Sequence, residues 1–152
     1  TRFTSDWSSD VCSSDLRKGR GEVLLRFPSP VLTGDKNNDR VAVEWYVAGM
    51  DKGPAQRSRA VVVIHESGRA MTVGRLFART LRQQGLHAFL VQLPGYGQRV
   101  GPGGRPSDDR FFDLLRQAIG DVRRARDAIV ALPLVDSSHV SQIRRASCRE
   151  RV

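Results

Sequence analysis

The side chains best suited to acid–base chemistry in this sequence are three histidines, His65, His87 and His139. They fall in different predicted elements, and no nucleophile accompanies them as a visible partner. A serine nucleophile on a strand-to-helix turn needs glycines on both sides, in the pattern G-x-S-x-G. Glycine pairs at that spacing surround only Asp51 and Arg99, so the chain lacks this turn.

A second glycine motif, Gly95-Tyr96-Gly97, could belong to a loop that binds a dinucleotide. Such a loop has the pattern G-x-G-x-x-G, follows a strand and opens a helix. Here the third glycine, Gly101, comes one residue late, Pro94 precedes the motif, and no helix is predicted directly after it. Nucleotide binding is therefore an alternative rather than the leading interpretation.

The elements that must position these residues begin with strands. Residues 22–27 and 41–47 are predicted to form an antiparallel pair, with a loop rich in proline, glycine and aspartate between them. Residues 60–65 contain a run of β-branched side chains, which is typical of a parallel strand buried on both faces. Residues 87–92 form the next predicted strand.

Two helices are predicted between and after these last strands. Residues 72–84 show helical spacing, with Gly85 at the position of a C-terminal cap. Ser107 is predicted to cap a second helix that continues to about Leu132. The apolar residues expected on one face are Val73, Leu76, Phe77 and Leu81 in the first helix, and Phe112, Leu115, Ile119, Val122 and Ile129 in the second. Residues 139–141 are predicted to begin another strand, so the pattern indicates a three-layer α/β domain.

Three short motifs, in this order and spacing, resemble the α/β-hydrolases, in particular dienelactone hydrolase, acetyl-xylan esterase and the catalytic domain of prolyl oligopeptidase. The motifs are His65-Glu66-Ser67-Gly68, Leu93-Pro94-Gly95-Tyr96-Gly97-Gln98, and Asp121 to Ala128 followed by Leu132-Pro133 and Val135-Asp136. The resemblance covers about residues 41–141. It implies the front part of an α/β-hydrolase sheet, with two antiparallel strands followed by β-α-β-α, in which the strand at 87–92 lies between the strands at 41–47 and 60–65.

The resemblance implies that His65, Glu66, Ser67 and Gly68 form the oxyanion loop, in which one backbone N–H donor is worth about 3 kcal/mol. The family has His-Gly where this chain has His65-Glu66, but Ser67 and Gly68 still offer N–H groups. The alternative is a loop that only joins strand to helix. The family's catalytic histidine comes late in the chain, so His65 is expected to shape the loop. The nucleophile should follow Ser141 within a few residues, and the acid and the histidine come later still.

Composition narrows the other function classes. The formal net charge is +9, but the arginines are scattered and no basic stripe contains aromatic residues, so nucleic-acid binding is not expected. No apolar run approaches the roughly 18 residues that a membrane span needs. The two cysteines, Cys12 and Cys148, are too isolated for a metal site, and no cofactor is expected. The compartment is unknown, with the cytoplasm as the default, and the oligomeric state is undecided.

Both ends of the chain, residues 1–16 and 142–152, resemble translated sequencing-library adapters. Ser13-Ser14-Asp15-Leu16 can be coded TCT TCC GAT CT, and the reverse complement of that string reads Ile-Gly-Arg; the chain has Ile143-Arg144-Arg145 at its other end. The alternative is a disordered Ser/Asp-rich tail and a basic tail. We therefore assign the domain to residues 17–141 and expect the two tails to contact nothing.

The leading hypothesis is that the chain is a fragment of a serine hydrolase that cleaves ester-like, or peptide, bonds in a small-molecule substrate. The fragment is expected to be inactive. The alternatives are a non-catalytic α/β binding domain and a nucleotide-binding α/β protein. The fragment is also expected to be poorly stable. Its strand at 60–65 would be left as an open edge, which favours aggregation, and part of the apolar stripe of its second helix would face water.

Overall fold

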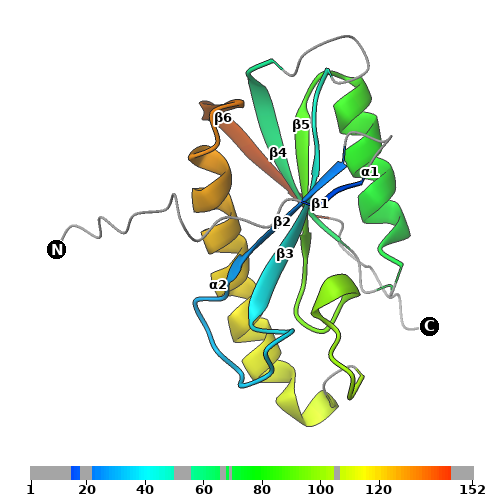
Figure 1. Cartoon of the computed structure of the whole chain (residues 1–152), viewed down its shortest axis with the longest axis vertical. Helices are drawn as coiled ribbons and strands as arrows, with labels where there is room; N and C mark the ends of the chain where they lie inside the picture. Colours follow the sequence, from blue (N-terminus) through cyan, green and yellow to red (C-terminus); the bar gives the residue numbers. More distant parts are fainter. Residues whose placement is uncertain are drawn as a thin grey trace, which may run out of the picture.

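The computed structural model describes residues 15–17, 22–49, 56–65, 68, 70–104 and 107–144. They form one sheet with helix α1 on one face and helix α2 on the other (Figure 1). The strands are β1 (Asp15–Arg17), β2 (Glu22–Pro28), β3 (Arg40–Tyr46), β4 (Ser58–Ile64), β5 (His87–Gln92) and β6 (Val135–Arg144). The helices are α1 (Thr72–Gln83) and α2 (Phe111–Val130), with 3₁₀ turns η1 (Gly97–Arg99) and η2 (Asp108–Arg110).

The strand order, β1-β2-β3-β5-β4-β6, confirms the predicted three-layer α/β fold. β2 and β3 are antiparallel neighbours, as expected, and β5 lies between β3 and β4. β4 is parallel to both β5 and β6. The chain therefore leaves β4 through α1 to reach β5, then returns through α2 to the other side of β4.

The core has two parts because successive side chains of a strand point to opposite faces. The part beneath α2 contains Val41, Val43, Ala60, Val62, Phe89, Val91, Ala125, Ala128 and Ile129. The part beneath α1 contains Tyr46, Val63, Met71, Ala78, Ala88, Leu90 and Tyr96. Every residue of β5 is buried, as expected for a central strand with a helix on each side.

Helix α1 lies close to the sheet because small residues face it. Gly74 and Ala78 are its buried residues, whereas Leu76 and Phe77 are 63% and 41% exposed. The predicted apolar face was therefore wrong for Leu76 and Phe77, since hydrophobic spacing alone overlooked the face made of glycine and alanine. The predicted cap is confirmed: Gly85 has φ 80°, and the amides of Gly85 and Leu86 bond back to Arg82 and Leu81 in a Schellman motif.

Helix α2 begins later than predicted. It starts at Phe111, after the η2 turn, and Ser107 does not cap it. The expectation that part of its apolar stripe faces water is confirmed, because Phe112, Leu115 and Ile119 are 80%, 46% and 50% exposed. Its first turns extend past the ends of the strands (Figure 1), where the sheet offers them nothing to pack against.

Strand β6 corrects two expectations about the ends of the domain. It is longer than predicted and runs beside β4, with Val62, Val63 and Ile64 paired to Gln142, Ile143 and Arg144. β4 is therefore not an open edge, and residues 142–144 do contact the domain. Residues 15–17 likewise pair with β2. The physical reason is that an edge strand presents backbone N–H and C=O groups, which pair with a neighbouring segment whatever its side chains.

The amino-terminal end of β5 is held by a buried histidine. His87 Nδ1 accepts hydrogen bonds from the Ala48 amide at 3.0 Å and from Trp45 Nε1 at 3.2 Å, and Nε2 lies 3.2 Å from the Gln56 carbonyl. The ring is therefore neutral with its proton on Nε2. Burial lowers the pKa of His87, although the carbonyls of Gln56 and Leu134 oppose the shift.

No helix in the described part of the chain is long and apolar enough to cross a membrane.

Replacing Gly74 by alanine is expected to lower the free energy of unfolding by about 1–3 kcal/mol through overpacking. An added Cβ would lie 2.9 Å from both His65 Cβ and Leu90 Cδ1. Gly120→Ala is the matched control, because it gains the same helix propensity but meets only the side-chain ends of Pro30 and Val31, at 3.1 and 3.3 Å. Urea unfolding of both variants gives the comparison, and an equal or larger loss for Gly120→Ala would contradict this packing.

The histidine contact predicts a pH dependence of stability. The pKa of folded His87 lies below its unfolded value of 6.5, so its contribution is present above pH 6.5 and is lost as the pH falls through the folded pKa. Thermal melts of the unsubstituted chain should therefore show a fall in Tm on acidification that His87→Asn reduces, since asparagine keeps an acceptor for Ala48 but does not titrate. An identical fall in both proteins would show that another group is responsible.

Candidate active site

The carboxyl ends of the parallel strands bring two of the predicted motifs together. His65 directly follows β4, and Leu93 directly follows the neighbouring strand β5. In open α/β sheets ligands bind outside these ends, where the chain connections diverge. Of the four predicted oxyanion-loop residues, His65 is buried and Gly68 is exposed; Glu66 and Ser67 lie outside the described residues.

His65 is held between two loops, the first after β4 and the second after β5. Its Nε2 accepts a hydrogen bond of 3.0 Å from the Leu93 amide, and its ring meets that of Tyr96 edge-on, with 4.8 Å between ring centroids. Because Nε2 is an acceptor, the neutral ring carries its proton on Nδ1. A histidine with Nε2 occupied by a backbone N–H is placed to join loops, and cannot take a proton from a nucleophile at that atom.

The chain enters α1 through an uncommon conformation at Met71. Its φ is 50°, a left-handed value that residues other than glycine seldom adopt. The Met71 amide bonds to the Gly68 carbonyl at 3.1 Å, and the side chain is buried in the core beneath α1. The loop after β4 is thus tied down at both ends, by His65 and by Met71.

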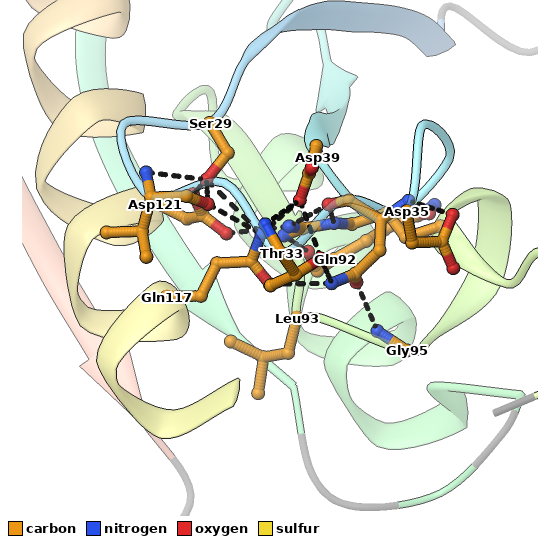
Figure 2. A network of polar contacts seen from close by, with 12 residues as sticks. Ser29, Thr33, Asp35, Asp39, Gln92, Leu93, Gly95, Gln117 and Asp121 are labelled. Atoms are coloured by element: carbon orange, nitrogen blue, oxygen red, sulfur yellow. Dashed lines mark hydrogen bonds and ion pairs between the residues drawn. The ribbon is translucent and has the colours of Figure 1, made fainter. Parts of the chain in front are cut away.

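A buried ion pair joins the η1 turn to α2, and its carboxylate, Asp121, is labelled in Figure 2. Arg99 Nη2 and Asp121 Oδ2 are 2.7 Å apart, and both side chains are fully shielded from solvent. Arg99 also donates to the Gln92 carbonyl at 3.1 Å and, through two nitrogens, to the Asn38 carbonyl. Asp121 Oδ1 accepts a hydrogen bond of 2.5 Å from Ser29 Oγ.

Amide side chains extend this polar cluster between the 29–39 segment and α2. Asn38 Nδ2 donates to Gln117 Oε1 at 2.6 Å, and Asn38 Oδ1 accepts the Gly95 amide at 2.9 Å. Gln117 Nε2 donates in turn to the Val31 carbonyl at 2.9 Å and to Asp39 Oδ1 at 3.1 Å. Figure 2 shows Gln117 and Asp121 of α2 facing Ser29 and Asp39 of the 29–39 segment. We call Ser29, Asn38, Arg99, Gln117 and Asp121, which are all buried, the buried polar cluster.

The pKa values within the cluster follow from its burial. Burial raises the pKa of Asp121 against the opposing effects of Arg99 and Ser29, and burial lowers the pKa of Arg99 against the opposing charge of Asp121. Each ion is thus held in its charged form mainly by the other.

Polar contacts on the α1 face of the sheet also hold the loop after β5. Gln92 Oε1 accepts the Gln98 amide at 2.7 Å, and Gln92 Nε2 donates to Glu44 at 2.8 Å. Glu44 also pairs with Arg75 of α1 at 2.6 Å. Burial alone would raise the pKa of Glu44, but hydrogen bonds from Arg75, Tyr46 and Gln92 outweigh it and lower the pKa.

The hollow found among the described residues lies away from this site. An open hollow of about 730 Å³ is lined by Arg57, Ser58, Arg59, Gln84, Gly85, Leu86 and Asp136, at the amino ends of β4 and β6. That is the edge opposite to His65. Within the described ranges, no three His, Cys, Asp or Glu side chains gather as metal ligands.

Gly95 and Gly97 serve the loop in a different way from a dinucleotide motif. They lead into the short η1 turn rather than into an α-helix, and the Gly95 amide is taken by Asn38. Gly97 has φ 54°, and an added Cβ would lie 2.5 Å from Gln92 Oε1. This glycine is required for close packing against Gln92.

Sequence reasoning missed the buried polar cluster. The sequence places Asn38 in a loop, Arg99 at the centre of a glycine pair and Gln117 within a helix, and none of these patterns indicates a buried side chain. One signal was available: Gln117, Asp121, Ala125 and Ala128 follow the helical spacing of a single face, so two polar residues continue the buried face of α2. Their partners could not be found in this way, since Asn38 lies 79 residues before Gln117, Ser29 lies 92 residues before Asp121, and Arg99 lies in a different element.

Comparisons with known proteins identify the fold. No family model and no curated protein matches the chain. Among solved structures, hypothetical protein PA2218 from Pseudomonas aeruginosa has a TM-score of 0.58 at 13% identity, covering 86% of this chain and 40% of its own. A cold-adapted esterase from an Arctic intertidal metagenomic library, solved bound to PEG, has a TM-score of 0.54 at 18% identity, covering 88% and 55%. DcsB in complex with its substrate analogue has a TM-score of 0.52 at 18% identity, covering 70% and 33%.

These likenesses show an α/β-hydrolase fold. The chain spans between a third and just over half of the length of these structures.

The ion pair predicts a strong energetic coupling. Arg99→Met should cost about 3–5 kcal/mol of stability, because it leaves a carboxylate buried without its partner. Adding Asp121→Asn removes that charge, so the double variant should lose less than the sum of the two single variants, by about 0.5–3 kcal/mol. Urea unfolding of the four proteins completes the cycle. Strictly additive losses would mean that the two ions do not stabilise each other.

Proposed function

We propose that the chain carries the front part of the catalytic domain of a serine hydrolase. The whole enzyme would cleave ester-like, or peptide, bonds in a small-molecule substrate. The observation that carries the proposal is the register of β4 and β6. Ala60 pairs with Val140 and Val61 with Ser141, so the strand that follows α2 runs parallel beside β4, towards the edge of the sheet where His65 lies. In hydrolases of this fold the nucleophile turn follows that strand, and it would stand beside the loop that His65 begins.

The substrate class is supported by the esterase of similar fold and by DcsB, which was solved with a substrate analogue. In this proposal His65 to Gly68 form the oxyanion loop. Its backbone N–H groups would stabilise the negative charge that develops on the carbonyl oxygen when a serine attacks it. Serine, acid and base would all come from sequence beyond Ser141, so the chain as it stands is proposed to be inactive.

We further propose that residues 1–16 and 142–152 derive from sequencing adapters, on the ground that the coding strings of Ser13–Leu16 and Ile143–Arg145 are complementary except at Arg144. The pairing of residues 15–17 and 142–144 with the sheet is compatible with this origin, because strand addition at an edge depends on backbone groups. The natural domain would then continue from residue 141 with a different sequence.

The source gene tests both proposals. Reading it outward from primers within codons 17–141 should reveal different residues after position 141, with G-x-S-x-G encoded within about ten residues. The same run of residues as in this chain would contradict the adapter origin. A different continuation without such a serine would contradict the hydrolase proposal and favour a non-catalytic binding domain.

An assay tests the proposed inactivity. The 152-residue chain should hydrolyse an activated ester no faster than the buffer does, because acyl transfer in this family needs an activated serine. Ser67→Ala and His65→Ala are the controls, since they remove the hydroxyl and the imidazole of the loop. Turnover that either substitution abolishes would show that the chain has a working nucleophile of its own.

A further inference from the structure

The orientation of His65 depends on the loop that follows β5. Its Nε2 accepts the Leu93 amide at 3.0 Å, and the Tyr96 ring packs edge-on against its own. Both partners belong to that loop, whereas His65 belongs to the loop after β4. A shift of the second loop would therefore remove the hydrogen bond to Nε2 and the ring contact together.

Two buried side chains hold the second loop in place. Asn38 Oδ1 accepts the Gly95 amide at 2.9 Å, between Leu93 and Tyr96 in the sequence. Arg99, at the end of the η1 turn, donates to the Gln92 carbonyl at 3.1 Å just before Leu93. Asn38 and Arg99 are both 1% exposed, so water does not compete for these bonds.

The same two side chains are anchored to α2. Asn38 donates to Gln117 at 2.6 Å, and Arg99 pairs with Asp121 at 2.7 Å. The Asn38 carbonyl also accepts Arg99 Nε at 3.0 Å, which joins the two anchors to each other. A continuous set of contacts thus runs from α2 through Asn38 and Arg99 to the loop, and from the loop to His65.

We propose that Asn38 and Arg99 are positioning residues for His65, which fix its tautomer and its place at the start of the loop after β4. Ser29 belongs to the same cluster, but its side chain bonds to Asp121, Gln117 and the 29–31 segment and does not reach the loop. The name oxyanion loop rests on the proposed function. The positioning itself does not, and its test needs no catalysis.

The test is nitrogen-15 NMR of the 152-residue chain, together with native-state hydrogen exchange. In the unsubstituted chain the His65 ring should be the Nδ1–H tautomer, and the amides of Leu93 and Gly95 should exchange slowly. Asn38→Ala should convert the ring to a mixture of tautomers and speed exchange of the Leu93 amide about tenfold, the size expected for one lost buried hydrogen bond. Arg99→Lys should act in the same direction, since one ammonium group cannot reach all of the acceptors that the guanidinium serves.

Ser29→Ala is the matched control, since it also removes a buried hydrogen-bonding side chain of the cluster. It should leave the His65 tautomer unchanged and alter Leu93 exchange no more than that of β5 amides. Equal effects of Asn38→Ala and Ser29→Ala would reduce the role to general stability and overturn the proposal. If the His65 ring of the unsubstituted chain carries its proton on Nε2, the positioning proposal is overturned without any variant. This outcome does not depend on what the source gene encodes after Ser141.

Discussion

The ion pair between Arg99 and Asp121 is the constraint on which much of this domain depends. Two ions without solvent contact are costly to bury, and their mutual attraction offsets that cost only when their remaining hydrogen-bonding groups are also satisfied. Ser29 donates to Asp121, and the carbonyls of Gln92 and Asn38 accept from Arg99. Satisfying one pair of charges therefore brings together α2, the end of β5 and a loop from the beginning of the domain.

The two faces of the sheet are stabilised differently as a result. Beneath α2, an apolar core of valine, phenylalanine and alanine gives way to the buried polar cluster towards the carboxyl ends of the strands. Beneath α1, Gly74 and Ala78 allow close approach, and the pair of Glu44 and Arg75 joins helix to strand. Hydrophobic burial supplies most of the driving force on both faces, while the polar contacts determine where the loops lie.

This division relates the fold to the proposed chemistry. A site for acyl transfer needs donors that are oriented before the substrate arrives, because reorientation during the reaction would forfeit their electrostatic effect. His65 begins the candidate loop and is held by a backbone amide and an aromatic ring. Phe111 and Phe112, two of the exposed apolar side chains of α2, lie outside this arrangement, in the first turn of a helix that extends beyond the sheet.

The sequence by itself determined the local elements and their order. The β-branched run at 60–65, the alternation of strands with helices and the capping role of Gly85 all follow from interactions between near neighbours in the chain, and all are present in the structure. The resemblance to α/β-hydrolases also predicted that β5 would lie between β3 and β4. Only the tertiary structure decided which side chains of the helices are buried, and it overturned the assignments of Leu76, Phe77 and Ser107. It alone showed that Asn38, Arg99 and Asp121 meet, because a buried polar residue is stabilised by partners that are distant in sequence, and no local pattern identifies them.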